Sequence, residues 1–285
     1  MKKLILAEKP SVAKNIADAT GAVKKNGYYE GESYLITWAF GHLLQLYDAR
    51  DYDPVMKTWR MERFPFVPED FRYKLKTDGK KKDKPDAGVV RQVNIIKSLM
   101  ERQDVEGIIS ATDDDREGQI IADEIWGFLK PDKPVERLLL NEWTPREVNR
   151  GLADLLSNDS MRPLRDAGFG RQIADWLIGI NLTSVATLKS KHGKDSHLLN
   201  VGRVLMPTLK IIYDRDKEIA EFKVTKYYKL TGFFKPGTKR QFEAVYYVDK
   251  NEKFDKPDEL AELKERITGL PARITDKKVT RKKEY

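Results

Sequence analysis

The chain has 285 residues, of which 40% are hydrophobic and 34% are charged, so it is long enough for about two domains with buried cores. Its 53 Lys and Arg exceed its 45 Asp and Glu, and the net charge of +8 favours a polyanionic partner such as nucleic acid. The absence of cysteine excludes disulfides, zinc–thiolate sites and cysteine nucleophiles. No apolar stretch is long enough for a membrane span or a signal peptide, so we expect a cytoplasmic protein without membrane association.

The first half of the chain alternates strand and helix patterns. Residues 4–7 are apolar and predict a buried strand that ends at Glu8, and Ser11 is expected to cap a helix through about Ala19. Further strands are predicted at residues 34–39, 108–111 and 136–140, with a helix at 89–101. Residues 52–73 are irregular and rich in aromatic residues, and residues 77–85 form a charged, turn-rich segment. The alternation predicts an α/β fold with a mostly parallel, helix-covered sheet.

The most informative segment is residues 107–119, Gly-Ile-Ile-Ser-Ala-Thr-Asp-Asp-Asp-Arg-Glu-Gly-Gln. An apolar strand ends where Asp113, Asp115 and Glu117 follow at alternate positions. Carboxylates this close repel one another unless a cation lies among them, and Mg²⁺ prefers oxygen ligands. Because functional residues gather at the carboxyl ends of parallel strands, Glu8 is expected to join these acids. The pattern therefore predicts a Mg²⁺ site for chemistry on phosphates.

The same residues also have structural interpretations. Asp115 directly precedes a predicted helix and is suited to cap it. Glu8 and Lys9 are adjacent and could form an exposed ion pair. The residues alone leave both interpretations open.

From Thr144 the pattern becomes helical. Thr144 is a predicted N-cap, with Pro145 in the first turn and Glu147 in the third helical position. Helices are predicted over residues 165–189 and 202–222, joined by a polar loop in which His192 and His197 have no accompanying metal ligands. After residue 224 the apolar period is two, which predicts a hairpin of residues 227–234 and 240–248, and a strand over 272–283 after a helix at 258–267.

Several spaced segments together resemble the type IA DNA topoisomerases, closest to bacterial topoisomerase III. They are Ala7-Glu8-Lys9-Pro10-Ser11, Phe40-Gly41-His42-Leu43-Leu44, Asp113 to Gln119, Asn141-Glu142-Trp143-Thr144, Arg171 to Gly179 and Val201 to Leu209. The acidic segments resemble the Toprim domain, which primases, some nucleases and type II topoisomerases also contain. The segments from Arg171 and from Val201 favour the type IA enzymes among these.

The resemblance implies a Rossmann-like Toprim domain over residues 1–150, a helical segment that binds single-stranded DNA over 151–222, and the first part of a β-rich arch over 223–285. Enzymes of this family cut one DNA strand by attack of a tyrosine on a phosphodiester, pass another strand through the gap and reseal it without ATP. By resemblance, Glu8 is an acid or base near the reacting oxygen, and Lys9 and Arg203 are cations at the scissile phosphate. The metal ligands it implies are Asp113, Asp115 and Glu117, with Glu8 beside them. The DNA-binding candidates are Arg171, Lys189, Lys191, Lys194 and Arg203.

None of the 12 tyrosines lies in a context that resembles the family's nucleophile. We therefore expect the chain to hold the acidic half of the site alone and to be inactive by itself, either as the N-terminal portion of a longer enzyme or as a truncated relative. Two other functions remain open. One is a Toprim nuclease in which water replaces the tyrosine. The other is a non-catalytic module that binds single-stranded DNA through cations and stacked aromatic rings.

Overall fold

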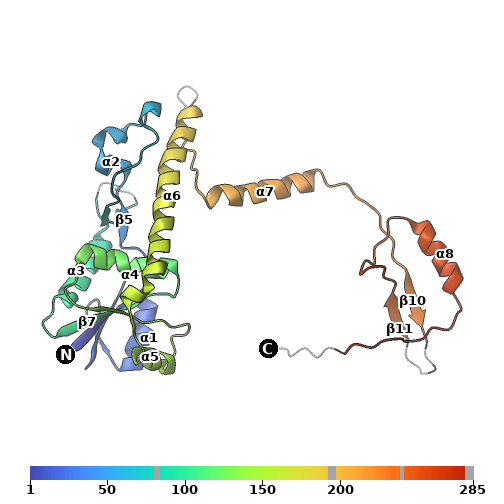
Figure 1. Cartoon of the computed structure of the whole chain (residues 1–285), viewed down its shortest axis with the longest axis horizontal. Coiled ribbons are helices and arrows are strands. Elements are labelled where there is room, and N and C mark those ends of the chain that lie inside the picture. The colour runs from blue at the N-terminus through green and yellow to red at the C-terminus, as the bar shows by residue number, and fades with distance from the viewer. Residues whose placement is uncertain (80–83, 192–196, 236, 238–240, 280–285) are drawn as a thin grey trace. The chain divides into compact units, whose positions relative to one another are not determined.

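A computed structural model of the chain describes residues 1–79, 84–191, 197–235, 237 and 241–279 (Figure 1). Residue contacts divide the chain into two compact units, residues 1–211 and 212–285. The first unit contains a mixed sheet which, in the described residues, has seven strands in the order β2-β3-β4-β1-β7-β8-β9. The predicted α/β class is confirmed.

The four central strands of this sheet are parallel. They are β4 (Tyr34–Trp38), β1 (Lys2–Ala7), β7 (Val105–Ala111) and β8 (Val135–Arg137). Short antiparallel strands flank them, namely β2 (Val23–Lys24), β3 (Tyr29–Glu30) and β9 (Leu156–Ser157). Ala7 at the end of β1 pairs with Trp38 of β4 and with Ala111 of β7. The carboxyl ends of three parallel strands therefore lie at one edge of the sheet.

Helices cover both faces of the sheet, because successive side chains of a strand point to opposite faces. On one face, Leu4 and Leu6 pack with α3 (Ala87–Met100) and α4 (Arg116–Leu129). On the other face, Ile5 packs with α1 (Pro10–Thr20) and α5 (Pro145–Leu152). All three side chains are fully buried. Because both faces of β1 are buried, its sequence is a continuous apolar run rather than an alternation of apolar and polar residues.

Two helix starts test the capping predictions. The expectation that Ser11 caps α1 is wrong, because the helix begins at Pro10 and Lys9 is the N-cap without a side-chain bond. Proline suits the first helical position, where its fixed φ is helical and its missing N–H is not needed. At α5 the prediction is confirmed, since the Thr144 hydroxyl accepts a hydrogen bond from the Glu147 amide at 3.4 Å.

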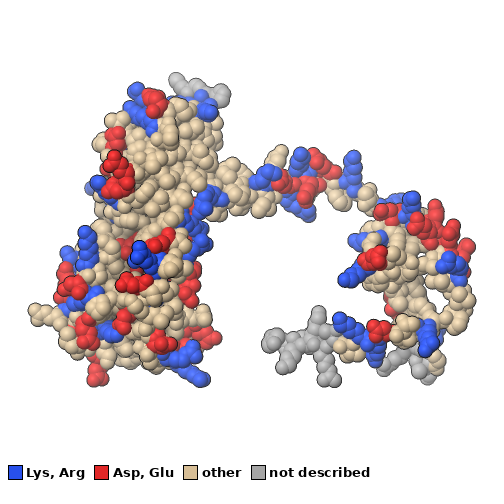
Figure 2. Space-filling model, viewed as in Figure 1, with Lys and Arg blue, Asp and Glu red and all other residues tan. Residues whose placement is uncertain are grey.

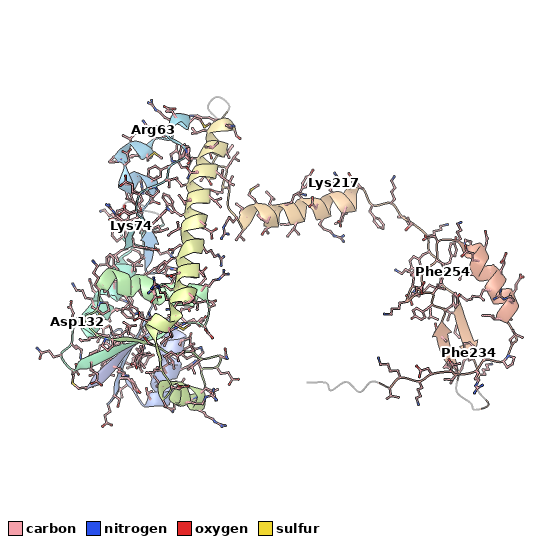
Figure 3. The ribbon with its side chains drawn as sticks, in the orientation of Figure 1. Arg63, Lys74, Asp132, Lys217, Phe234 and Phe254 are labelled. Atoms are coloured by element: carbon pink, nitrogen blue, oxygen red, sulfur yellow. The ribbon has the colours of Figure 1, made fainter. Side chains whose placement is uncertain are left out.

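Two short paired strands that the sequence did not reveal flank the irregular segment, and we call them the β5–β6 hairpin. Strands β5 (Leu44–Leu46) and β6 (Tyr73–Leu75) pair antiparallel, and α2 (Ala49–Tyr52) with two short 3₁₀ turns, Pro54–Lys57 and Met61–Arg63, lies between them. Figure 3 labels two residues that fix this segment: Lys74 pairs with Asp48 and Asp51, and the Arg63 guanidinium donates to the Thr58 carbonyl at 2.8 Å.

The long helix α6 (Arg162–Lys189) packs against both α4 and this aromatic segment. The Trp176 ring contacts Phe66 and Phe71 with centroid distances of 6.1 and 5.9 Å, so Trp176 is a packing residue. At Gly168 a Cβ atom would lie 2.5 Å from a side-chain carbon of Ile120, so only glycine allows the two helices to approach this closely. Residues 151–211 thus belong to the same compact unit as the sheet, and the domain boundaries after residues 150 and 222 stay predictions.

Helix α7 (Leu205–Ala220) follows as predicted, with charges of both signs on its surface (Figure 2). The second unit contains the predicted hairpin in shorter form, β10 (Thr231–Phe234) and β11 (Phe242–Val245), and the predicted helix α8 (Pro257–Ile267). Phe234, labelled in Figure 3, stacks on Phe242 at 5.3 Å between ring centroids.

The predicted strand over residues 272–283 is wrong for its described part. Residues 272–279 form no strand, and Ile274 and Val279 are 74% and 71% exposed, because no strand edge pairs with this segment in the described residues. Residues 280–283 of the predicted strand lie outside the described residues. Among the helices that the structure describes, none is long and apolar enough to cross a membrane.

Candidate functional site

The two acidic segments meet at the edge of the sheet where β1 and β7 end. The Glu8 carboxylate accepts a hydrogen bond from the Asp113 amide at 2.9 Å, although 105 positions separate the two residues. Burial is the main cause that raises the pKa of Glu8, and the negative charges of Asp113 and Asp115 raise it further. A raised pKa is the property that a carboxyl group needs if it is to carry a proton near neutral pH.

Each of the three acids after β7 has its own partner. The Lys9 ammonium lies 3.4 Å from the Asp113 carboxylate, so Lys9 pairs with Asp113 rather than with Glu8. One Asp115 oxygen accepts from the Gly118 amide at 2.7 Å, which confirms that Asp115 caps α4. Glu117 pairs with a cation of α6, as described below. Because the acids point to separate partners, no group of three acidic or His side chains in the described residues is close enough together to hold a metal ion.

The donor chemistry of this edge nevertheless suits Mg²⁺. Glu8, Asp113, Asp115 and Glu117 offer carboxylate oxygens, the ligands that Mg²⁺ prefers. Asp113 and Glu117 are 42% and 48% exposed at their side chains, so water can complete the coordination. The type of donor atom therefore suits the ion, while the described side chains are not gathered around one point.

Gly118 sets how closely α4 approaches the acidic loop. A Cβ atom at this position would lie 2.2 Å from the Asp113 carbonyl oxygen, far inside van der Waals contact. Glycine therefore allows the first turn of α4 to lie directly on the backbone of Asp113.

Arg137 is a residue of the site that the sequence interpretation missed. It ends β8, and its side chain is fully buried. Its guanidinium donates to the Thr112 hydroxyl and the Asp113 carbonyl, both at 2.7 Å, and to the Ser110 carbonyl at 3.2 Å. Burial lowers the pKa of Arg137. An arginine directly before the apolar run Leu138-Leu139-Leu140 was the signal that could have identified it.

A buried carboxylate connects the acidic edge to α6. Glu124 of α4, whose side chain is fully buried, lies 2.8 Å from the His42 Nδ1 atom and accepts from the Gln172 amide at 2.6 Å. The other ring nitrogen of His42 is 3.5 Å from Glu117. The hydrogen bond with Glu124 is the main cause that raises the pKa of His42. His42, which lies in one of the family-like segments, thus bridges two carboxylates.

Two predicted DNA-binding arginines share Asp175 of α6, and one of them also reaches Glu117. The Arg171 guanidinium is 3.3 Å from Glu117 and 3.7 Å from Asp175, and the Arg203 Nε atom donates to Asp175 at 2.5 Å. Figure 2 shows acidic and basic side chains interleaved where α4 and α6 meet. The Arg203 guanidinium lowers the pKa of Asp175.

The remaining predicted cations lie elsewhere. Lys189 is 18 positions beyond Arg171, roughly 27 Å along α6 at the rise of an α-helix. Lys191 follows the end of that helix, and Lys194 lies outside the described residues. The structure therefore brings Arg171 to Glu117, and it brings Arg203 to Asp175, the second partner of Arg171, while Lys189 lies farther along the helix.

Comparisons with known proteins agree over most of the chain. Residues 3–143 match the Toprim domain family, and residues 159–285 match the DNA topoisomerase family. DNA topoisomerase 3 of Staphylococcus epidermidis is 39% identical over 81% of this chain, and that of Staphylococcus aureus is 33% identical over all of it. Full-length topoisomerase I from Thermotoga maritima has a similar structure, with a TM-score of 0.57 and 25% identity over 92% of this chain.

The chain spans about a third of the length of these proteins. It covers 30% of the Staphylococcus epidermidis protein, 37% of the Staphylococcus aureus protein and 37% of the Thermotoga maritima chain.

Proposed function

Since this chain belongs to the type IA DNA topoisomerases, an enzyme family, we propose that it supplies the acidic, Mg²⁺-binding half of a site that cleaves and reseals one DNA strand. The observation that carries the proposal is the hydrogen bond between Glu8 and the Asp113 amide, which brings the two acidic segments to one sheet edge. With DNA as the proposed substrate, the cytoplasm is the proposed location of this activity.

The residues divide into three chemical roles. Glu8, whose pKa is raised mainly by burial, is the proposed acid that gives a proton to the leaving oxygen and takes it back on resealing. Asp113 and Asp115, assisted by Glu117, would hold Mg²⁺, which when bound offsets negative charge on phosphate oxygens. Lys9 and Arg203 supply positive charge to the scissile phosphate, Lys9 as a point charge and Arg203 through two parallel donors.

Single-stranded DNA is the proposed partner, and α6 with its neighbouring loop is the proposed contact. Arg171 contacts Glu117 and shares Asp175 with Arg203, which supports a proposed place for the scissile phosphate near these two arginines. A strand that continues along α6 would meet Lys189 and then Lys191, which are the proposed contacts farther from the acids. Lys194 remains a prediction of the same kind.

Fluorescence anisotropy with labelled oligonucleotides tests this proposal. Affinity should fall steeply with salt, and Arg203→Gln should weaken binding and flatten the log–log slope by about 0.7, the value for one phosphate on a single strand. Arg162→Gln is the matched control, because Arg162 lies at the start of α6, is 73% exposed and pairs only with Asp166 in the described residues. Salt-independent binding, or tighter binding of duplex than of single strand, would contradict the proposal.

The cleavage and resealing reaction itself is proposed for a complete site. We expect the 285-residue chain alone not to relax supercoiled plasmid, because its sequence holds no family-like nucleophile segment.

A further inference from the structure

The predicted metal ligand Glu117 is already occupied by a cation of the chain itself. Its carboxylate lies 3.3 Å from the Arg171 guanidinium, which reaches it from α6. We propose that Mg²⁺ displaces Arg171 from Glu117 and that the released guanidinium binds a DNA phosphate, so that metal and DNA strengthen each other's binding. This inference rests on the proposed function and assigns a mechanism to the same site.

The ion pair is suited to displacement. The side chains of Arg171 and Glu117 are 35% and 48% exposed, and ion pairs with this much exposure contribute little to stability. Arg171 and a divalent cation repel each other, so they cannot share Glu117 at low cost. Binding of Mg²⁺ therefore favours the conformation in which Arg171 has moved away.

Asp175 keeps the released arginine near the site. One oxygen of Asp175 lies 3.7 Å from the Nε atom of Arg171, and the other accepts from the Nε atom of Arg203 at 2.5 Å. Both arginines thus face Asp175 through Nε, which leaves their terminal nitrogens for other partners. Those of Arg203 have no hydrogen-bond partner within the described part of the chain. After displacement, two guanidinium groups held by one carboxylate can bind the same phosphate in the bidentate way that favours arginine.

The proposed exchange relates the affinities for Mg²⁺ and for DNA, because coupling between two ligands is reciprocal. If Mg²⁺ raises the affinity for a single strand through Arg171, the strand must raise the affinity for Mg²⁺ by the same factor. Removal of Arg171 must abolish this factor. Removal of Arg171 must also raise the affinity for Mg²⁺ in the absence of DNA, because Arg171 no longer competes with the ion for Glu117.

The first measurement is calorimetric titration of Mg²⁺ into the chain without DNA. Arg171→Gln should bind Mg²⁺ about two- to fivefold more tightly than the wild type, the size expected for loss of one exposed ion pair. Arg162→Gln, which removes the same charge from the same helix away from the acids, should leave the affinity unchanged. Equal Mg²⁺ affinity in wild type and Arg171→Gln would overturn the inference while leaving the proposed function in place.

The second measurement is anisotropy with a single-stranded oligonucleotide, with Mg²⁺ and with chelator. The wild type and Arg162→Gln should bind more tightly with Mg²⁺, and Arg171→Gln should lose this gain. In chelator, Glu117→Gln should bind DNA more tightly than the wild type, because Arg171 has lost its ion-pair partner. The Glu117→Gln/Arg171→Gln double variant should not show this gain. If Arg171→Gln retains the full effect of Mg²⁺, the exchange does not occur. If the wild type binds no Mg²⁺ at all, the proposed function fails as well.

Discussion

Arg137 lies in an environment that arginine rarely occupies, because its side chain is fully buried beneath the acidic loop. Within the described residues, its hydrogen bonds go to backbone carbonyls and a hydroxyl rather than to a carboxylate, and its Nε atom has no partner there. A buried charge held in this way fixes the backbone of Asp113 through its carbonyl and leaves the Asp113 side chain to its own partner, Lys9. The residue therefore positions the loop without taking part in the chemistry.

We predict that Arg137→Met lowers the free energy of unfolding by about 1–3 kcal/mol, because it leaves the Asp113 carbonyl and the Thr112 hydroxyl without their partner. Urea unfolding of the purified chain measures this change. Arg150→Met is the control: Arg150 is 74% exposed on α5, and its removal should change stability by less than about 0.5 kcal/mol. Equal effects of the two substitutions would contradict the role of Arg137.

Glu30 gives a pH dependence whose sign follows from its partners. Its carboxylate accepts from Lys2 at 2.7 Å and from Arg102 at 2.9 Å, and these bonds lower its pKa to about 2. The stabilisation is complete above the ordinary pKa of 4.5 and is lost as the pH falls towards 2. Wild type should therefore be more stable than Glu30→Gln at pH 7, and the difference should shrink by pH 3 in urea unfolding. A constant difference would contradict the assignment, and Glu32→Gln, at an exposed position nearby, is the control.

At the scale of elements, the position of α4 against the end of β7 decides the geometry of the acids. Asp115 caps the helix, and Gly118 lets its first turn lie on Asp113. Both features are local, yet together they set the distance between the strand end and the helix that carries Glu117. The same helix holds Glu124, which links the acids to α6 through Gln172.

We predict that Gly118→Ala destabilises the chain by about 1–3 kcal/mol and weakens Mg²⁺ binding, because the added methyl group forces α4 away from Asp113. Gly127 of the same helix is the matched control, since a Cβ atom there meets nothing within 4 Å. Gly127→Ala should stabilise the chain by about 0.5–1 kcal/mol through the lower entropy of the unfolded chain. Urea unfolding and Mg²⁺ titration of both variants test this contrast, and similar behaviour of the two would refute it.

The sequence predicted those elements whose pattern is local and regular. β1 and β7 are apolar runs bounded by acids, and α3, α6 and α8 have helical spacing or caps, so their existence was predicted and their ends differ by a few residues. The β5–β6 hairpin was not predicted, because its segment is held by contacts with α6 more than a hundred positions away, such as that of Asn181 with the Phe66 backbone. Local sequence patterns do not reveal contacts between residues so far apart in the chain.

The candidate site shows the same division. The approach of Glu8 to Asp113 was predicted, because an alternation of strands and helices implies parallel strands whose carboxyl ends lie at the same edge. The partners of the acidic loop were not predicted from the sequence. Arg171, His42 and Arg137 reach it from three separate parts of the fold. Residue type and spacing identify candidate ligands, and only the fold shows what occupies them.

At the scale of the whole molecule, the basic residues that give the net charge of +8 include two groups with different surroundings. Cations beside the acids are paired with them, as Lys9 with Asp113 and Arg171 with Glu117. Lys189 and Lys191 lie far along or beyond α6, where a nucleic acid strand could extend. Residues 3–143 match the Toprim domain family and residues 159–285 match the DNA topoisomerase family, and the DNA topoisomerase 3 of Staphylococcus aureus is similar over the whole chain.

Calorimetric titration of Mg²⁺ tests the central claim, that the acids at the ends of β1 and β7 form a metal site in this chain. The wild type should bind Mg²⁺, and the Asp113→Ala/Asp115→Ala variant should lose that binding, because the two carboxylates are the proposed ligands. Asp258→Ala/Glu259→Ala, which removes two acids from the first turn of α8 in the other unit, should bind as the wild type does. Equal heats and affinities in the wild type and the Asp113→Ala/Asp115→Ala variant would contradict the account.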